Sequence, residues 1–231
     1  MGNDTMDLAQ LASLLRRDQR ELDKLASRGQ LPGRKVGGAW RFANAEIQQW
    51  LEAEMPGLDE DQLKSLEEAH PEPAEPLITN LLAPDCVELP LQARTPASVI
   101  RAMVRLAEQS WQVYDPDAVL TAVQAREERG STAQETGVAV LHPPRPLVDA
   151  LGESVVAFGR TASGVPFGSP KLTDLFFLVC CRDQKTHLRV LARLSRLFLR
   201  PEFLDALRAA DGAAEALQVI RNAEKDLLAA V

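Results

Sequence analysis

The sequence lacks a long apolar run, and it is poor in cysteine and histidine, with three of each among 231 residues. No apolar stretch reaches the roughly 18–20 residues that a membrane-spanning helix needs. Residues 1–4 also lack the basic and apolar regions of a secretion signal. The sequence therefore predicts a cytoplasmic protein that has no membrane partner.

The sequence also excludes a disulfide framework, a metal site and a P-loop. Three cysteines, Cys86, Cys180 and Cys181, cannot form a disulfide framework, and the last two lie in an apolar run that predicts buried, unreactive thiols. The cysteines and histidines show no metal-ligand spacing, so we expect no metal. Gly159 and Gly164 have the spacing of a P-loop, but valine and proline stand where its lysine and hydroxyl residue belong. We therefore expect no nucleotide and no cofactor.

The net charge of −7 is concentrated in one segment. Residues 1–52 carry 8 basic and 7 acidic side chains, residues 53–76 carry 1 and 8, and residues 77–231 carry 17 and 18. Prolines and like charges oppose a packed fold, so we interpret 53–76 as an acidic linker between two domains, 1–52 and 77–231. Leucines at 58, 63 and 66 would still permit a short helix within it.

The first domain has the pattern of two short helices, a hairpin and a third helix. Leucines mark the first two helices, Gly37-Gly38 fits a tight turn, and Ile47, Trp50 and Leu51 form an apolar face. This order, with Gly-x-Leu-Pro at 29–32 and Val-Gly-Gly-Ala-Trp-Arg-Phe at 36–42, resembles the winged helix-turn-helix domains of the excisionase and MerR-like family. In such a domain the second helix enters the major groove and the wing lies along the phosphates.

The resemblance implies a set of cationic side chains that contact DNA. The contacts on the helices are Arg16, Arg17, Arg20 and Lys24, and those on the wing are Arg34, Lys35 and Arg41. Asp18, Glu21 and Asp23 fall in the presumed recognition helix and oppose DNA binding there. A protein-binding or dimerising domain is the alternative interpretation.

Residues 77–231 alternate strand and helix signals, which indicates an α/β fold. Thr95-Pro96 and Asp115-Pro116 predict the starts of helices over 96–109 and 116–129. Apolar runs predict strands over 137–141, 154–159 and 173–181, and further helices are expected over 185–199, 201–210 and 213–229.

Two of the three histidines stand in a distinctive frame. His142 directly follows the predicted strand 137–141, and Arg126 precedes it by 16 residues. Ser131 and Thr132 lie between them, and His187 begins a helix 45 residues after His142. An imidazole at a strand end, with an arginine and hydroxyls nearby, has the chemistry to accept a phosphoryl group.

These residues resemble the phosphorylation-site signature of phosphotransferase-system enzyme IIA domains of the fructose, mannitol and nitrogen-regulatory (PtsN-like) class, over residues 77–231. The resemblance implies a mixed sheet with helices on both faces. It implies that His142 accepts a phosphoryl group from an HPr-type phosphocarrier, while His187 contacts that group or orients the ring. Arg126 would supply positive charge, and Ser131 and Thr132 would donate hydroxyls or only cap the chain after Gly130. Leu141 departs from the pattern, because proline usually precedes the active histidine.

The combination predicts a phosphohistidine transfer protein rather than a turnover enzyme. We interpret it as a regulatory protein of the nitrogen branch that carries a DNA-binding module. One alternative is a carrier that passes phosphate to a sugar-specific IIB component, and another is a non-phosphorylated interaction protein. DNA and a regulatory target protein are further expected partners, and a homodimer stays open because winged modules often pair.

Overall fold

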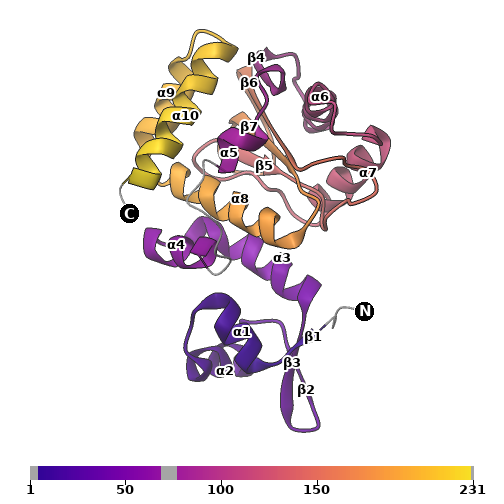
Figure 1. The fold of residues 1–231 in the computed structure, drawn as a ribbon, viewed down its shortest axis with the longest axis vertical. Coiled ribbons are helices and arrows are strands. Elements are labelled where there is room, and N and C mark those ends of the chain that lie inside the picture. Colours follow the sequence, from indigo (N-terminus) through magenta and orange to yellow (C-terminus); the bar gives the residue numbers. More distant parts are fainter. Residues whose placement is uncertain (1–4, 69–76, 230–231) are drawn as a thin grey trace. The chain divides into compact units, whose positions relative to one another are not determined.

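The computed structural model of the chain describes residues 5–68 and 77–229. It divides into two compact units, residues 1–72 and 73–231 (Figure 1). His70 and the proline-rich part of the expected linker, 69–76, lie outside the described residues. Within the described ranges, no helix is long and apolar enough to cross a membrane.

The first unit is a small helical domain with a three-stranded sheet in the order β1-β3-β2. Its core contains Leu11, Leu22, Leu31 and Phe42, all of which are almost fully buried. The elements are β1 (Thr5–Met6), α1 (Leu8–Leu15), α2 (Gln19–Ser27), β2 (Arg34–Val36), β3 (Ala39–Ala43), α3 (Asn44–Glu54), the 3₁₀ turn η1 (Met55–Gly57) and α4 (Glu60–Glu68).

Short-range signals explain where the elements of the first unit start and turn. Asp7 caps α1 in a capping box with Gln10, and Asp18 caps α2 by accepting from the backbone N–H groups of Arg20 and Glu21. Gly37 and Gly38 have φ of +59° and +83° in the two-residue turn between β2 and β3. The expectation that Asp18 lies inside the recognition helix was therefore wrong, because this carboxylate is its N-cap.

Part of the segment assigned to the linker is folded. Residues 53–57 complete α3 and η1, and α4 follows directly. The first compact unit accordingly reaches residue 72, beyond the expected boundary at 52. The short helix that the leucines at 58, 63 and 66 permitted is thus present.

The second unit is an α/β domain built on a four-stranded sheet. The strands are β4 (Val87–Leu91), β5 (Val138–Leu141), β6 (Val155–Val165) and β7 (Thr173–Cys180). The helices are α5 (Leu77–Leu81), η2 (Pro84–Cys86), α6 (Pro96–Glu108), α7 (Pro116–Glu127), α8 (Gln184–Phe198), α9 (Pro201–Ala209) and α10 (Ala213–Ala229).

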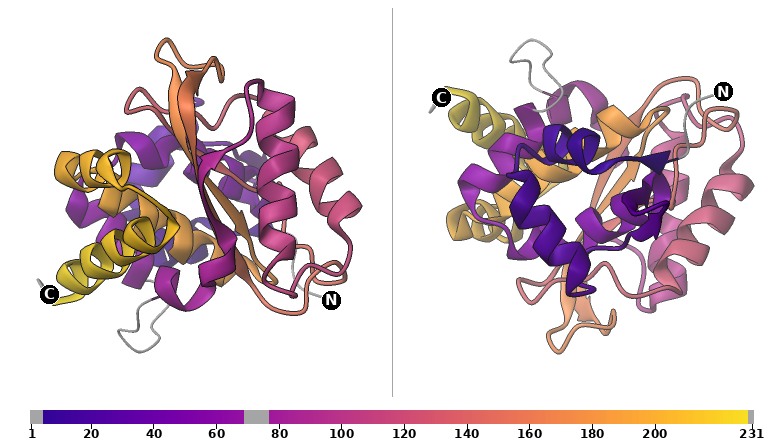
Figure 2. Two further views of the ribbon diagram at one scale, coloured as in Figure 1. Left: turned by 90° about the horizontal axis from the view of Figure 1, so that it is seen from above. Right: turned by 90° about the horizontal axis from the view of Figure 1, so that it is seen from below.

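The sheet of this unit is mixed, with the order β4-β6-β7-β5. β4 runs parallel to β6, β6 antiparallel to β7, and β7 parallel to β5. Helices α6 and α7 cover one face, and α8, α9 and α10 lie on the other (Figure 2). The expectation of a mixed sheet between two layers of helices is confirmed.

Several sequence signals set this architecture. Thr95 and Asp115 cap α6 and α7, each with proline at the first helical position, as expected. All residues of β5 are buried, and β7 is almost wholly buried. Strand β6 runs six residues beyond the predicted 154–159, so the glycines at 159 and 164 lie inside a strand and form no phosphate-binding loop.

The three thiols are buried and unpaired with one another. Burial raises the pKa of Cys86 to about 11 and that of Cys181 to about 12, and it also raises the pKa of Cys180. Because the thiolate is the reactive form, these cysteines are protonated and unreactive at neutral pH, as the apolar run predicted.

A buried ion pair between α8 and α10 holds α5, the first helix of the second unit. Arg193 of α8 donates from Nη1 to Glu224 Oε1 of α10 at 2.8 Å, with side-chain exposures of 2% and 0%. The two oxygens of Glu224 also accept the backbone N–H groups of Ile78 and Thr79, both at 2.8 Å, at the start of α5. One carboxylate therefore joins three helices and satisfies two otherwise unpaired helix-start donors.

We expect Glu224→Ala to destabilise the second unit by about 3 kcal/mol or more, because it removes the carboxylate that accepts from a buried guanidinium and from the backbone N–H groups of Ile78 and Thr79. Urea unfolding followed by circular dichroism measures the loss. Lys225→Ala, at the exposed neighbouring position, is the matched control and should leave the midpoint unchanged. Equal midpoints for Glu224→Ala and wild type would show that the ion pair contributes no net stability.

Candidate functional site

His142 and His187 meet at the edge of the sheet where β5 and β7 end. The two strands are parallel and in register from Val138 with Leu175 to Leu141 with Leu178. His142 follows β5 immediately, and His187 lies in the first turn of α8, which Asp183 caps shortly after β7. The ring centroids are 5.2 Å apart, with an interplanar angle of 55°.

The environment of His142 selects one imidazole tautomer. Its Nδ1 lies 2.8 Å from the carbonyl oxygen of Val140, an acceptor only, so Nδ1 carries the proton. On the other side, Arg126 donates from Nε to Nε2 of the ring at 3.2 Å. The hydrogen bonds therefore assign the lone pair, and with it the nucleophilic character, to Nε2.

Arg126 reaches the ring from the last turn of α7. Besides its bond to His142, its Nη1 donates to the carbonyl oxygen of Gly130 at 3.0 Å. The bond to Gly130 fixes the side chain across the loop that follows the helix. A guanidinium beside the nucleophilic nitrogen is well placed to neutralise an anion bound there.

Ser131 and Thr132 are tied into the loop between α7 and β5. Ser131 Oγ donates a short hydrogen bond to the carbonyl oxygen of Phe167 and accepts from the backbone N–H of Ala133 at 3.1 Å. Thr132 donates to Glu127 from its backbone N–H at 3.0 Å and from its hydroxyl at 2.9 Å. Both hydroxyls thus shape the loop, and their contact with a phosphoryl group stays a prediction.

Glu127 holds the loop beside the site through Thr132, a role that was not predicted from the sequence. It follows Arg126 at the end of α7, and its two oxygens hold Thr132 five residues later. An acidic residue next to the arginine, with a hydroxyl residue just past the helix end, was the available signal. Glu127 fixes the start of the loop that carries the chain from α7 toward β5.

Leu141 and the prolines after His142 also have defined places. Leu141 is fully buried and pairs with Leu178, so the residue that replaces the usual proline continues β5 up to the histidine. After the proline-rich turn, Leu147 donates its backbone N–H to the carbonyl oxygen of Cys181 at 3.3 Å. This bond holds the loop that follows His142 to the end of β7.

The match to a family model decides what this site belongs to. Residues 80–223 match the family described as "Phosphoenolpyruvate-dependent sugar phosphotransferase system, EIIA 2". The chain belongs to this family. Residues 5–55 match the model of a helix-turn-helix domain. The enzyme IIA part and the helix-turn-helix part of the resemblance are therefore confirmed, and the EIIA fold implies phosphoryl transfer. The excisionase and MerR-like type and the nitrogen-regulatory branch stay predictions.

Relatives of this EIIA domain include sugar-specific components of the phosphotransferase system. The chain is 29% identical over 154 residues to the fructose-specific EIIABC component of Bacillus subtilis, covering 64% of this chain but only 24% of that protein. It is 28% identical over 138 residues to the fructose-specific EIIA component of Haloferax volcanii, covering 58% of this chain and 88% of that one.

Solved structures share the fold at lower identity. The nitrogen regulatory protein IIA-Ntr of Neisseria meningitidis superposes with a TM-score of 0.56 at 24% identity, covering 62% of this chain and 99% of that one. IIA mannitol of Escherichia coli gives a TM-score of 0.53 at 20% identity, over 60% of this chain and 97% of that one.

The cations expected to contact DNA fall into two groups in the helix-turn-helix unit. Arg20 and Lys24 of α2, Arg34 and Lys35 of β2, and Arg41 of β3 are exposed on the helix and the hairpin. Arg16 and Arg17 lie instead in the turn between α1 and α2, where Arg16 pairs with Glu68 at 3.1 Å. Of the opposing acids, Asp18 caps α2 and Asp23 accepts from the Trp40 indole at 2.7 Å.

We expect the neutral His142 ring to be protonated at Nδ1, the tautomer that free histidine disfavours. Nitrogen-15 chemical shifts of the two ring nitrogens, measured by long-range correlation at a pH where the ring is neutral, distinguish the two forms. His70, which stands among the prolines, is the internal comparison. A His142 spectrum with the proton on Nε2 would contradict the hydrogen bond to Val140.

Proposed function

We propose that this chain is a phosphohistidine carrier in which Nε2 of His142 accepts a phosphoryl group from an HPr-type phosphocarrier. In this proposal, phosphorylation of His142 regulates the helix-turn-helix unit on the same chain. The observation that carries the proposal is the pair of hydrogen bonds at the His142 ring. Nδ1 donates to the carbonyl oxygen of Val140, and Nε2, which keeps the lone pair, accepts from Nε of Arg126 at 3.2 Å. Membership of the EIIA family gives that geometry its chemical meaning.

The transfer needs only the groups at the site. The Nε2 lone pair attacks the phosphorus of the donor phosphohistidine, a new N–P bond forms, and the donor N–P bond breaks with its electron pair returning to the donor ring. The proton stays on Nδ1 and keeps its hydrogen bond to the carbonyl oxygen of Val140. This hydrogen bond stabilises the positive charge that the phosphorylated ring acquires.

Arg126 and His187 have distinct roles in this proposal. The Arg126 guanidinium is displaced from the lone pair by the arriving phosphoryl group and pairs with its oxygens. His187, with its ring centroid 5.2 Å from that of His142, donates to a phosphoryl oxygen from the second side. Closure of the donor protein over the two rings would exclude water and prevent hydrolysis.

We expect the wild-type chain to gain one phosphoryl mass when incubated with phosphoenolpyruvate, enzyme I and HPr, and His142→Gln to gain none. Arg126→Gln should slow the transfer about tenfold to a hundredfold, since it removes a charge-assisted donor from the transferred group. Intact-mass analysis at neutral to alkaline pH, where phosphohistidine survives, gives the extent and the rate.

Arg129→Gln, at an exposed position just beyond α7, is the matched control and should transfer at the wild-type rate. Absence of any gain with a cognate HPr would overturn the carrier function and leave a non-phosphorylated interaction protein. Rapid onward transfer to a IIB component, with no effect of deleting residues 1–60, would favour the sugar carrier. That alternative is supported by the names of the relatives and by the neighbouring structure of Escherichia coli IIA mannitol in complex with phosphorylated IIB.

The regulatory part of the proposal is supported by the helix-turn-helix domain on the same chain. Exposed cations on α2 and on the β2–β3 hairpin match the helix and wing of such a domain on DNA. Phosphorylation adds about two negative charges and so supplies a signal for this unit. A change in DNA affinity on phosphorylation is the expected output.

We expect Arg20→Ala and Lys24→Ala each to weaken binding to a duplex selected from a random library and to reduce the salt slope by about one where the contact is to phosphate. Arg221→Ala, on exposed α10 of the other unit, is the control and should bind as wild type. Fluorescence anisotropy at several salt concentrations provides both quantities. Identical affinities for unmodified, phosphorylated and His142→Glu protein would refute the switch while leaving DNA binding intact.

A further inference from the structure

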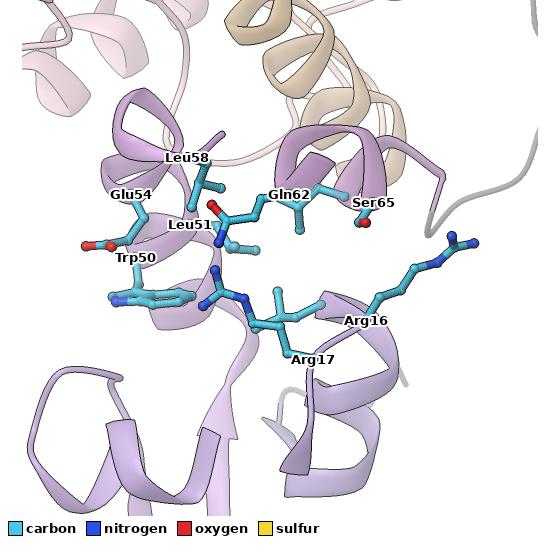
Figure 3. A pocket seen from close by; sticks show the side chains of 10 residues that line it. Arg16, Arg17, Trp50, Leu51, Glu54, Leu58, Gln62 and Ser65 are labelled. Atoms are coloured by element: carbon cyan, nitrogen blue, oxygen red, sulfur yellow. The ribbon is translucent and has the colours of Figure 1, made fainter. Parts of the chain in front are cut away.

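The helix-turn-helix unit contains a pocket that has no role in the proposed phosphoryl transfer and that lies apart from the exposed cations of α2 and the β2–β3 hairpin. It has a volume of about 80 Å³ and lies between the end of α1, the last turns of α3 and the face of α4 (Figure 3). Leu15 and Leu51, 4% and 3% exposed, line it together with Leu58 and Leu66. Trp50 closes one side and is oriented by its indole N–H, which donates to the carbonyl oxygen of Gln30 at 2.8 Å.

Two polar side chains point into this apolar pocket. The guanidinium of Arg17 and the carboxamide of Gln62 converge near the indole of Trp50, whereas Arg16 extends away and Glu54 is directed away from Arg17 (Figure 3). Arg17 has an ion-pair contact with Glu21 at 3.7 Å, a long distance that leaves most of its donors for another acceptor.

We propose that this pocket binds a small organic monocarboxylate with a short apolar chain. A guanidinium presents two parallel donors to a carboxylate, and the adjacent amide adds a third. The leucines would take up the hydrocarbon part of the ligand. An apolar cavity of about 150 Å³ holds one benzene molecule, so a volume of about 80 Å³ fits a hydrocarbon chain of about three carbon atoms, with the carboxylate at Arg17 and Gln62.

The position of the pocket makes it an effector site for the DNA-reading helix. Arg17 directly precedes Asp18, the N-cap of α2. Arg16 has a left-handed backbone with φ of +50°, and its guanidinium donates to the Glu68 side chain at 3.1 Å and to the Glu68 carbonyl oxygen at 3.0 Å. Because α4 thus already holds this turn, a ligand between Arg17 and Gln62 would add a second connection and fix the orientation of α2.

The test is a titration of the full-length chain with butyrate, followed by the three tryptophan indole N–H signals in a nitrogen-15 correlation spectrum. We expect the Trp50 signal to shift saturably with a dissociation constant in the millimolar range, while the Trp111 signal stays in place. Arg17→Met should weaken binding at least about tenfold, because it removes both charge-assisted donors of the guanidinium. Arg28→Met, at the exposed position just after α2, is the matched control and should bind as wild type.

Two further arms locate and identify the ligand class. Ser65→Phe places a ring in the pocket from α4 and should abolish the shift, and the neutral isostere butyramide should bind at least about tenfold more weakly than butyrate. Equal binding of the amide, retained binding in Ser65→Phe, or no saturable shift of Trp50 would overturn the proposal. The readout involves neither phosphoryl transfer nor DNA, so its failure is distinct from failure of the proposed function.

Discussion

Four consecutive backbone pairs between β5 and β7, from Val138 with Leu175 to Leu141 with Leu178, determine where the two histidines lie. Parallel strands end at the same edge of a sheet, so the residue after β5 and the first turn of the helix after β7 are brought together. A shift of one residue in this register would turn every side chain of β5 to the opposite face. The buried apolar residues on both faces of the two strands oppose such a shift, and the distance between the imidazoles therefore depends on the core.

A backbone group orients the imidazole ring of His142. The carbonyl oxygen of Val140 takes the Nδ1 proton, and Arg126 approaches the other nitrogen. A carboxylate at Nδ1 would stabilise the protonated ring more strongly and would add negative charge next to an incoming phosphoryl group. A neutral carbonyl orients the ring without that repulsion, which suits the proposed role of His142 in receiving a phosphoryl group and releasing it again.

The sequence was sufficient for some parts of this arrangement because the signals were local. Capping residues with proline located α6 and α7, and apolar runs located β5 and β7. Strand β4 was missed because Pro90 and Glu88 break its apolar pattern, and the structure tolerates them because β4 is an edge strand. The roles of Glu127 and Val140 depend on contacts that only the folded loop creates. The pairing of Arg193 with Glu224, 31 residues apart, likewise has no local pattern to reveal it.

In the proposed switch, the charge of a phosphoryl group on His142 would influence DNA binding only over a short range. The first compact unit, residues 1–72, carries 9 basic and 14 acidic side chains, and phosphorylation would add about two further negative charges to the chain. At physiological salt, however, a field is screened over about 8 Å, which is less than the width of a helix with its side chains. Within the first unit, α4 holds the turn before α2 through the ion pair of Arg16 with Glu68, so a change that reached α4 would also reach the proposed recognition helix.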